Sequence, residues 1–291
     1  MEEVEIENSL DGKFSDGAIP FEISRFIFLP AKKLRGVLIK VKSRRNVLKK
    51  ISSWITESGL RPIFVHFQGV NHEYEVIRVL FDYTNSNISP EKFVTELTKL
   101  EDLIDIKMFT PEIEGFLPDI VSYPLLMSGA RTVIFRKPVY EGLLVGLRER
   151  FGSGGEAFLY HIGFEIGKRA GKSHREIARQ LRVINPLEIL RQISANLFKC
   201  AGFGVAQIID SDSTVKPPQL TIRVEDSFEC SLSSNEKKPY SHFTRGMLAG
   251  IVTELFGTPA TATETKCIAE GHPYCEFIIK PENVKIKAEN Q

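Results

Sequence analysis

A regular succession of strand-like and helix-like segments between residues 36 and 109 most constrains the fold of this 291-residue chain. The strand-like segments carry apolar side chains at every second position, as Val37, Ile39 and Val41 do between lysines. The helix-like segments repeat them at every third or fourth position, and the second follows a typical capping residue, Ser89. Their order is strand, helix, strand, strand, helix, strand. This order predicts a ferredoxin-like βαββαβ domain, in which two helices back a four-stranded antiparallel sheet.

The remainder of the chain predicts a second domain with helices first and strands mostly afterwards. Apolar residues repeat with a helical period in the segments 139–151, 154–171, 187–202 and 243–255, with a basic polar helix at 174–182. Strand-like segments are 205–209, 220–224 and the two sides of a hairpin at 260–270 and 275–280. The fold class is therefore α+β. The predicted divisions are a lead-in over 1–34, a first domain over 35–110, a second domain over 120–282 and a tail over 283–291.

Glycines spaced four apart mark two of the expected helices. Gly163, Gly167 and Gly171 lie on one helix, and Gly246 and Gly250 lie on another. Each costs about 1 kcal/mol in a helix relative to alanine. We expect them because a missing side chain lets a second helix backbone come close.

Composition and charge argue against several classes of protein. With 38 basic and 37 acidic residues, net charge gives no reason to expect direct nucleic-acid binding. No apolar run approaches the length of a membrane span, and the N-terminus lacks the basic start and apolar core of a signal peptide. We therefore expect a cytoplasmic protein. Four cysteines are too few for a secreted disulfide framework, so free thiols or metal ligands are the better interpretation.

The last helix and hairpin carry a spaced set of residues that resembles a known family, the vinyl-4-reductase domain. The glycines at 246 and 250, Glu264, Cys267 and Cys275 match the family's pattern, whereas its first cysteine is replaced by Ser241. The resemblance reaches back less specifically to about residue 120. It implies a helical and sheet domain that binds a small hydrophobic molecule, as in aromatic-sensing bacterial activators. It also implies zinc, held at the matching positions Glu264, Cys267 and Cys275.

The fourth zinc ligand has to come from elsewhere, because serine is not a usual zinc ligand. Cys230 and His242 are the candidates, and we prefer Cys230 since another soft thiolate raises zinc affinity. Glu264 and Cys267 are three residues apart and would point to opposite faces of a regular strand, so the site requires a bulge or twist there. The alternative is that the cysteines are buried thiols that pack as small apolar side chains. Cys200 is expected to be a core thiol.

The first domain resembles the ACT-type regulatory domains, which pair into larger sheets and often bind amino acids. Where those domains carry an aspartate and a glycine, this chain has Ser43-Arg44-Arg45-Asn46. Dimerisation is therefore the expected role, and we predict a homodimer.

No catalytic motif is recognised, so no catalytic residue is predicted. The favoured hypothesis is a non-enzymatic regulatory protein that binds a small hydrophobic ligand and acts on transcription through a partner. The alternatives are an assembly adaptor resembling vesicle-tethering subunits and a tetrapyrrole vinyl reductase. In the resembled family the matching helices enclose an apolar pocket, which implies a ligand pocket lined by phenylalanines of these helices. The alternative is that these side chains are ordinary core. The residues concerned are Phe151, Phe158, Phe164, Phe198 and Phe203.

Overall fold

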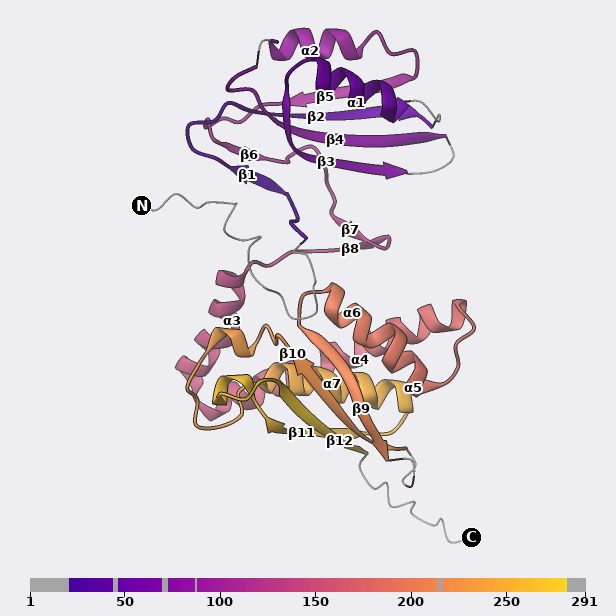
Figure 1. Ribbon diagram of the computed structural model, residues 1–291. Coiled ribbons are helices and arrows are strands. Elements are labelled where there is room, and N and C mark those ends of the chain that lie inside the picture. Colours follow the sequence, from indigo (N-terminus) through magenta and orange to yellow (C-terminus); the bar gives the residue numbers. More distant parts are fainter. Residues whose placement is uncertain are drawn as a thin grey trace. The chain divides into compact units, whose positions relative to one another are not determined.

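The chain forms two compact units, residues 1–133 and 134–291, each described here by itself. The computed structural model describes residues 21–43, 47–69, 73–86, 88–212, 214 and 217–281 (Figure 1). It has an α+β architecture with antiparallel sheets in both units, as the sequence predicts.

The N-terminal unit is built on a four-stranded sheet in the order β3-β4-β2-β5. Its strands are β2 (Leu34–Lys42), β3 (Arg61–Gly69), β4 (Tyr74–Asp82) and β5 (Leu103–Phe109). The helices are α1 (Val47–Glu57) and α2 (Pro90–Leu97), and Ser89 caps α2 by accepting a hydrogen bond from the backbone N–H of Lys92. All pairings are antiparallel, so the predicted ferredoxin-like βαββαβ order is confirmed.

The two faces of this sheet are covered differently. The alternating residues Val37, Ile39 and Val41 pack against apolar residues of both helices. The opposite face contributes Leu34, Leu80 and Phe109 to a second cluster. A ribbon of β1 (Phe26–Phe28) and β6 (Phe116–Pro118) supplies the other two buried side chains of that cluster, Ile27 and Leu117. The unit therefore has three layers.

The segment from Thr110 to Met127 takes part in the fold of the N-terminal unit. It contains β6, and it leads into a hairpin of β7 (Leu126–Met127) and β8 (Ala130–Arg131). Asp119 is buried and forms ion pairs with Arg25 at 2.7 Å and Arg78 at 2.8 Å. Pro118 ends β6, a position on an edge ribbon that tolerates a residue without an N–H donor. The compact units divide after Val133.

The C-terminal unit places its helices on one face of a sheet ordered β11-β12-β10-β9. The strands are β9 (Val205–Asp212), β10 (Gln219–Glu225), β11 (Ala260–Lys266) and β12 (Cys275–Pro281). The helices are α3 (Lys137–Phe151), α4 (Ser153–Gln180), α5 (Pro186–Ile189), α6 (Ala195–Cys200) and α7 (His242–Phe256). Short helical turns are η3 (Leu190–Ser194), η4 (Cys230–Leu232) and η5 (Ile268–Glu270). The separate helix predicted at 174–182 is the last part of α4.

Helices α4 and α7 meet backbone to backbone through their glycines, as predicted. A Cβ added at Gly163 would lie 2.2 Å from the Phe243 carbonyl oxygen, and one at Gly246 would lie 2.0 Å from that of Tyr160. Real contacts of a Cβ are almost never below 3.0 Å. Gly167 and Gly250 approach backbone oxygens as closely, at 2.1 Å, whereas a Cβ at Gly171 would first meet the Glu254 side chain at 2.9 Å. The spacing of four residues therefore records a tight helix pair.

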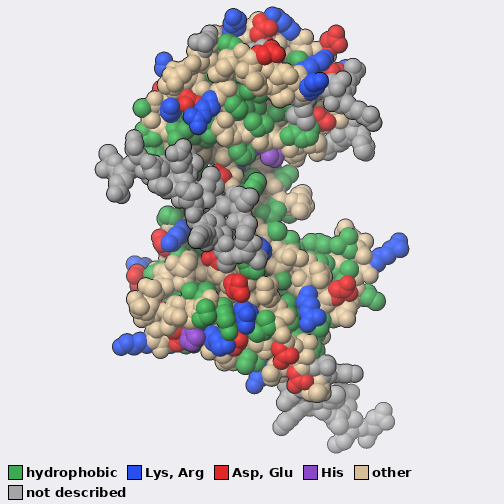
Figure 2. Space-filling view, in the orientation of Figure 1, with side chains coloured by type: hydrophobic (Ala, Val, Ile, Leu, Met, Phe, Trp, Pro, Cys, Tyr) green, Lys and Arg blue, Asp and Glu red, His purple; other side chains and the backbone are tan. Residues whose placement is uncertain are grey.

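Acidic and basic side chains are interspersed over the visible face of both units (Figure 2). This matches the balanced composition of the sequence. Within the described residues, no helix combines the length and apolarity that a membrane crossing requires.

Candidate metal centre and apolar cavity

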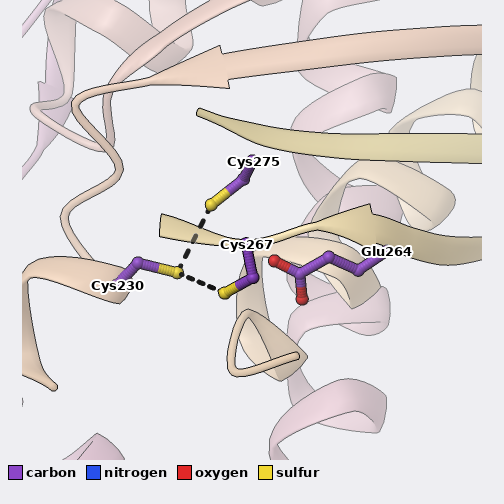
Figure 3. Close-up of side chains that lie close together, drawn as sticks. All are labelled: Cys230, Glu264, Cys267 and Cys275. Carbon is purple, nitrogen blue, oxygen red and sulfur yellow. Dashed lines mark hydrogen bonds between the residues drawn. The ribbon is translucent and has the colours of Figure 1, made fainter. Parts of the chain in front are cut away.

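Three cysteines and one glutamate converge at one end of the C-terminal sheet (Figure 3). Cys230 comes from η4, Glu264 from β11, Cys267 from the turn after β11, and Cys275 from the first position of β12. All four residues are at least 94% buried. Their ligand atoms lie within 4.8 Å of one another.

The sulfur atoms lie slightly closer to one another than they would around a tetrahedral zinc ion. Cys230 Sγ lies 3.5 Å from Cys267 Sγ and 3.4 Å from Cys275 Sγ. A tetrahedral zinc ion with Zn–S bonds of about 2.3 Å separates its sulfur ligands by roughly 3.8 Å. Small outward movements of the thiols would therefore admit the ion. The donor set fits zinc in both chemistry and spacing.

A β-bulge brings Glu264 and Cys267 to the same side of the sheet. The pairing of β11 with β12 shifts between Glu264 and Lys266, so one extra residue is accommodated there. An extra residue reverses the alternation of side chains that otherwise separates positions three apart. This is the irregularity that the sequence analysis required.

Two backbone N–H groups point at sulfur atoms of the cluster, one from the turn between Cys267 and Cys275 and one from the segment just before α7. The N–H of Ile268 points at Cys275 Sγ at 3.4 Å, and that of Tyr240 points at Cys267 Sγ at the same distance. Gly271 adopts a left-handed conformation, with φ of 94°, which closes η5 and turns the chain back toward β12. Such N–H donors stabilise thiolates, the form of cysteine that binds metals.

The cluster is electrostatically unusual in the metal-free chain. Hydrogen bonds from Cys230 and Cys275 lower the pKa of Cys267, while the pKa of Cys230 is raised, first by its hydrogen bond to Cys267. Burial, together with the charge of Cys267, raises the pKa of Glu264 to about 8. These shifts favour ionisation of the Cys267 thiol and oppose ionisation of the Glu264 carboxyl group. A bound cation would relieve this conflict because it stabilises every ionised ligand.

His242, the other candidate for the fourth ligand, is held away from the cluster. Its Nδ1 lies 3.0 Å from the Tyr240 carbonyl oxygen, and its Nε2 lies 3.6 Å from Glu156. The structure therefore brings Cys230, and not His242, to Glu264, Cys267 and Cys275. Ser241 is also buried beside these four residues, as its hydrogen bonds to Cys230 and Glu264 show.

A small apolar cavity lies between η3, α6, the sheet and α7. It is lined by Leu190, Ser194, Ala195, Phe198, Ala206, Ile208, Ile222, Leu248 and Ile251. Its volume is about 10 Å³, which is room for about one water molecule. A larger guest would have to displace lining side chains.

The wall of the cavity contains two irregular features. Residues 190–194 form a π-helical turn, a rare element that often occurs at functional sites. Ser194 carries the one polar side chain among the lining residues, and its Oγ lies 2.9 Å from Nδ1 of buried His174. Burial lowers the pKa of His174, so this imidazole is neutral near pH 7.

Several residues expected at the pocket or in the core lie elsewhere. Of the five phenylalanines, Phe198 lines the cavity, whereas Phe151 and Phe158 are more than half exposed. Cys200 is exposed at the end of α6, so its assignment as a core thiol is wrong. Helical periodicity located these elements but not the face that each side chain takes near a helix end. His174 and Ser194 were missed because a lone histidine in a basic helix carries no distinctive sequence signal.

These features define an α+β domain that holds a buried cluster of three cysteines and a glutamate and, separately, a small apolar cavity. Residues 220–281 of this domain match the family described as the V4R domain. An uncharacterized protein of Methanocaldococcus jannaschii is 28% identical over 145 residues, which is 50% of this chain and 75% of the relative.

Two solved structures are among those that resemble part of this chain. The phenol-responsive sensory domain of the transcription activator PoxR, solved with phenol, is 18% identical, with a TM-score of 0.48. That match covers 54% of this chain and 79% of the other. A vinyl-4-reductase family protein from Methanocaldococcus jannaschii is 24% identical, with a TM-score of 0.37, and covers 52% and 85%.

Proposed function

We propose that the C-terminal unit binds a structural zinc ion through Cys230, Glu264, Cys267 and Cys275. The observation that carries this proposal is the convergence of four buried donor atoms within 4.8 Å. Three sulfurs favour zinc over magnesium or calcium, which prefer oxygen ligands. Four protein ligands leave no open position for water, so the ion's role is structural. It would join η4 to both strands of the hairpin.

Metal analysis by mass spectrometry of protein purified without chelator tests the zinc proposal. We expect close to one zinc per chain, and Cys267→Ser should release it and lower the melting temperature. Cys200→Ser is the matched control, because Cys200 is exposed and lies outside the cluster. Less than about one zinc in ten chains of the unaltered protein would contradict the proposal, given the tight binding of structural zinc sites.

A second candidate function, binding of a small hydrophobic ligand, rests on the apolar cavity and its π-helical turn. Its nearly all-apolar lining suits a nonpolar molecule, and Ser194 could hydrogen-bond one hydroxyl or carbonyl group of it. Because the cavity holds only about 10 Å³, binding requires outward movement of its wall. The π-helical turn is the part of the wall best suited to move, since its hydrogen bonding is already irregular.

Thermal unfolding in the presence of small aromatic and aliphatic alcohols tests this second function. A bound ligand should raise the melting temperature in proportion to the logarithm of its concentration. Ile222→Trp would fill the cavity and should abolish the shift, whereas Ile278→Trp, on the strand of the sheet next to it, should retain it. The register pairs Ile278 with Thr221, which places it on the opposite face of the sheet from Ile222. No shift with any compound would count against a ligand-binding role.

We further propose that the chain is a regulatory protein that acts through a partner. The ligand-binding unit and the ferredoxin-like unit together suit a sensor joined to an assembly domain. Mass spectrometry of the native protein separates the alternatives. A co-purified small molecule supports the sensor, a stable complex with other proteins supports an assembly adaptor, and a redox cofactor supports a reductase.

A further inference from the structure

Ser241 holds both carboxylate oxygens of Glu264. The Ser241 hydroxyl donates a hydrogen bond to Glu264 Oε1 at 2.7 Å, and its backbone N–H donates to Oε2 at 3.0 Å. The same hydroxyl lies 2.9 Å from Cys230 Sγ and 3.7 Å from Cys275 Sγ. Ser241 is completely buried, so these contacts are shielded from water.

The hydroxyl is available for this contact because another residue caps the helix. Ser241 is the N-cap of α7, and a serine there usually accepts a hydrogen bond from the first turn. Its side chain makes no such bond. The carboxylate of Glu229 instead accepts from the backbone N–H groups of Phe243 at 3.1 Å and Thr244 at 2.7 Å.

Glu229 is in turn fixed by an ion pair with Arg148. Arg148 also donates to the Tyr240 carbonyl oxygen at 2.8 Å and stacks over the Tyr240 ring at 3.9 Å. This network holds the chain immediately before Ser241. The contacts of Arg148 with Tyr240, before Ser241, and of Glu229 with the first turn of α7, after it, therefore direct the Ser241 side chain at the cluster.

We propose that Ser241 is a positioning residue of the metal centre, which fixes the Glu264 carboxylate so that it can face the metal with the three sulfurs. The proposal rests on the zinc site proposed above. A neutral hydroxyl is not among zinc's usual protein ligands, whereas hydrogen-bond donors to ligating carboxylates orient them and raise affinity. Without Ser241, the buried carboxylate would lose two donors and its fixed orientation.

Competition between the protein and a chromophoric chelator measures the zinc dissociation constant. Ser241→Ala should weaken zinc binding about 10- to 100-fold, the usual effect of removing a hydrogen-bond partner of a metal ligand. Ser227→Ala is the matched control, because Ser227 is also buried but its hydroxyl has no hydrogen-bond partner among the residues that the structure describes. This control should bind zinc as the unaltered protein does.

Cobalt substitution provides a readout that a merely structural role would not change. In cobalt-loaded Ser241→Ala, the thiolate charge-transfer band should keep its intensity, because three thiolates remain. The d–d bands should shift, because the carboxylate changes its orientation.

An unchanged dissociation constant in Ser241→Ala would overturn the proposal. The proposal would also fail if Ser241→Ala lowered the melting temperature of the metal-free protein but left the zinc affinity of the folded protein unchanged. That pattern would mean that Ser241 acts in folding alone. If the unaltered protein binds no zinc, the proposed metal site itself fails. That outcome is recognised before any variant is compared.

Discussion

Two chemically identical substitutions, Gly167→Ala and Gly142→Ala, should change stability in opposite directions. Both glycines lie within helices of the C-terminal unit. A Cβ at Gly167 would lie 2.1 Å from the Met247 carbonyl oxygen and 2.8 Å from its carbonyl carbon. A Cβ at Gly142 would meet no atom within 4 Å.

The magnitudes follow from these distances. Each alanine gains about 1 kcal/mol of helix propensity. At Gly167 the obstacle is backbone and cannot rotate away, so we take the upper end of the usual cost of overpacking, about 3 kcal/mol. Gly167→Ala should then destabilise the unit by about 2 kcal/mol, and Gly142→Ala should stabilise it by about 1 kcal/mol. The difference of about 3 kcal/mol corresponds to roughly 6–12 °C in melting temperature for a unit of this size.

Thermal unfolding followed by circular dichroism and by tryptophan fluorescence measures this difference. The chain's single tryptophan is residue 54, in the N-terminal unit, so fluorescence follows that unit. The shift should appear in the circular dichroism transition of the other unit and leave the fluorescence transition unchanged. If Gly167→Ala melts at or above Gly142→Ala, the inferred tightness of the α4 and α7 contact is wrong.

Three further predictions concern acid stability, the metal ligands and assembly. Burial lowers the pKa of His174 below 6.5, and burial is the main cause that lowers the pKa of His242 to about 4. Below pH 6.5 these histidines therefore take up protons in the unfolded chain but not in the folded chain. In urea titrations the stability that these two histidines contribute should therefore be lost from pH 6.5 toward pH 4, partly offset by Glu264, whose raised pKa acts in the opposite sense. The decline should be less steep in His174→Gln than in a variant of the exposed His161. Cys230→Ser should release zinc. The double variant Cys230→Ser, Ser241→Cys should bind zinc again, because Cys230 Sγ and Ser241 Oγ are 2.9 Å apart. Metal analysis that finds no zinc in the double variant would contradict this. The chain should sediment as a homodimer at micromolar concentration, and a 32.8 kDa species would count against it.

Sequence periodicity predicted the elements well because both sheets have one strongly apolar face. In β2 the alternation of Val37, Ile39 and Val41 left a single register that buries all three. The glycines of α4 and α7 were equally informative, since a helix-breaking residue repeated every four positions has few uses other than close packing. The ribbon of β1 and β6 could not be anticipated, because its pairing joins segments about 90 residues apart.

The candidate metal site was partly predictable because three of its four residues are close together in the sequence. Glu264, Cys267 and Cys275 lie within twelve residues, so local spacing indicated them. Cys230 was chosen on ligand chemistry alone, and it is the folding of η4 against the hairpin that brings it to the cluster. Glu229 caps α7 from 14 positions before Phe243 in the sequence. No periodic pattern in the sequence predicts this contact. The position of Ser241 follows from that contact.

The π-helical turn at residues 190–194 makes the helix that contains it sensitive to length as well as to sequence. Such a turn accommodates one residue more than an α-helical path, so the segments on either side are out of phase by about 100° relative to a continuous α-helix. Deleting one residue here would restore the regular helix and rotate the side chains before the deletion. Leu190 and Phe198, which both line the cavity, would then no longer face it together. A single-codon deletion would thus reshape the cavity wall without any amino-acid replacement, a route by which relatives with the same residues could differ in what they accommodate.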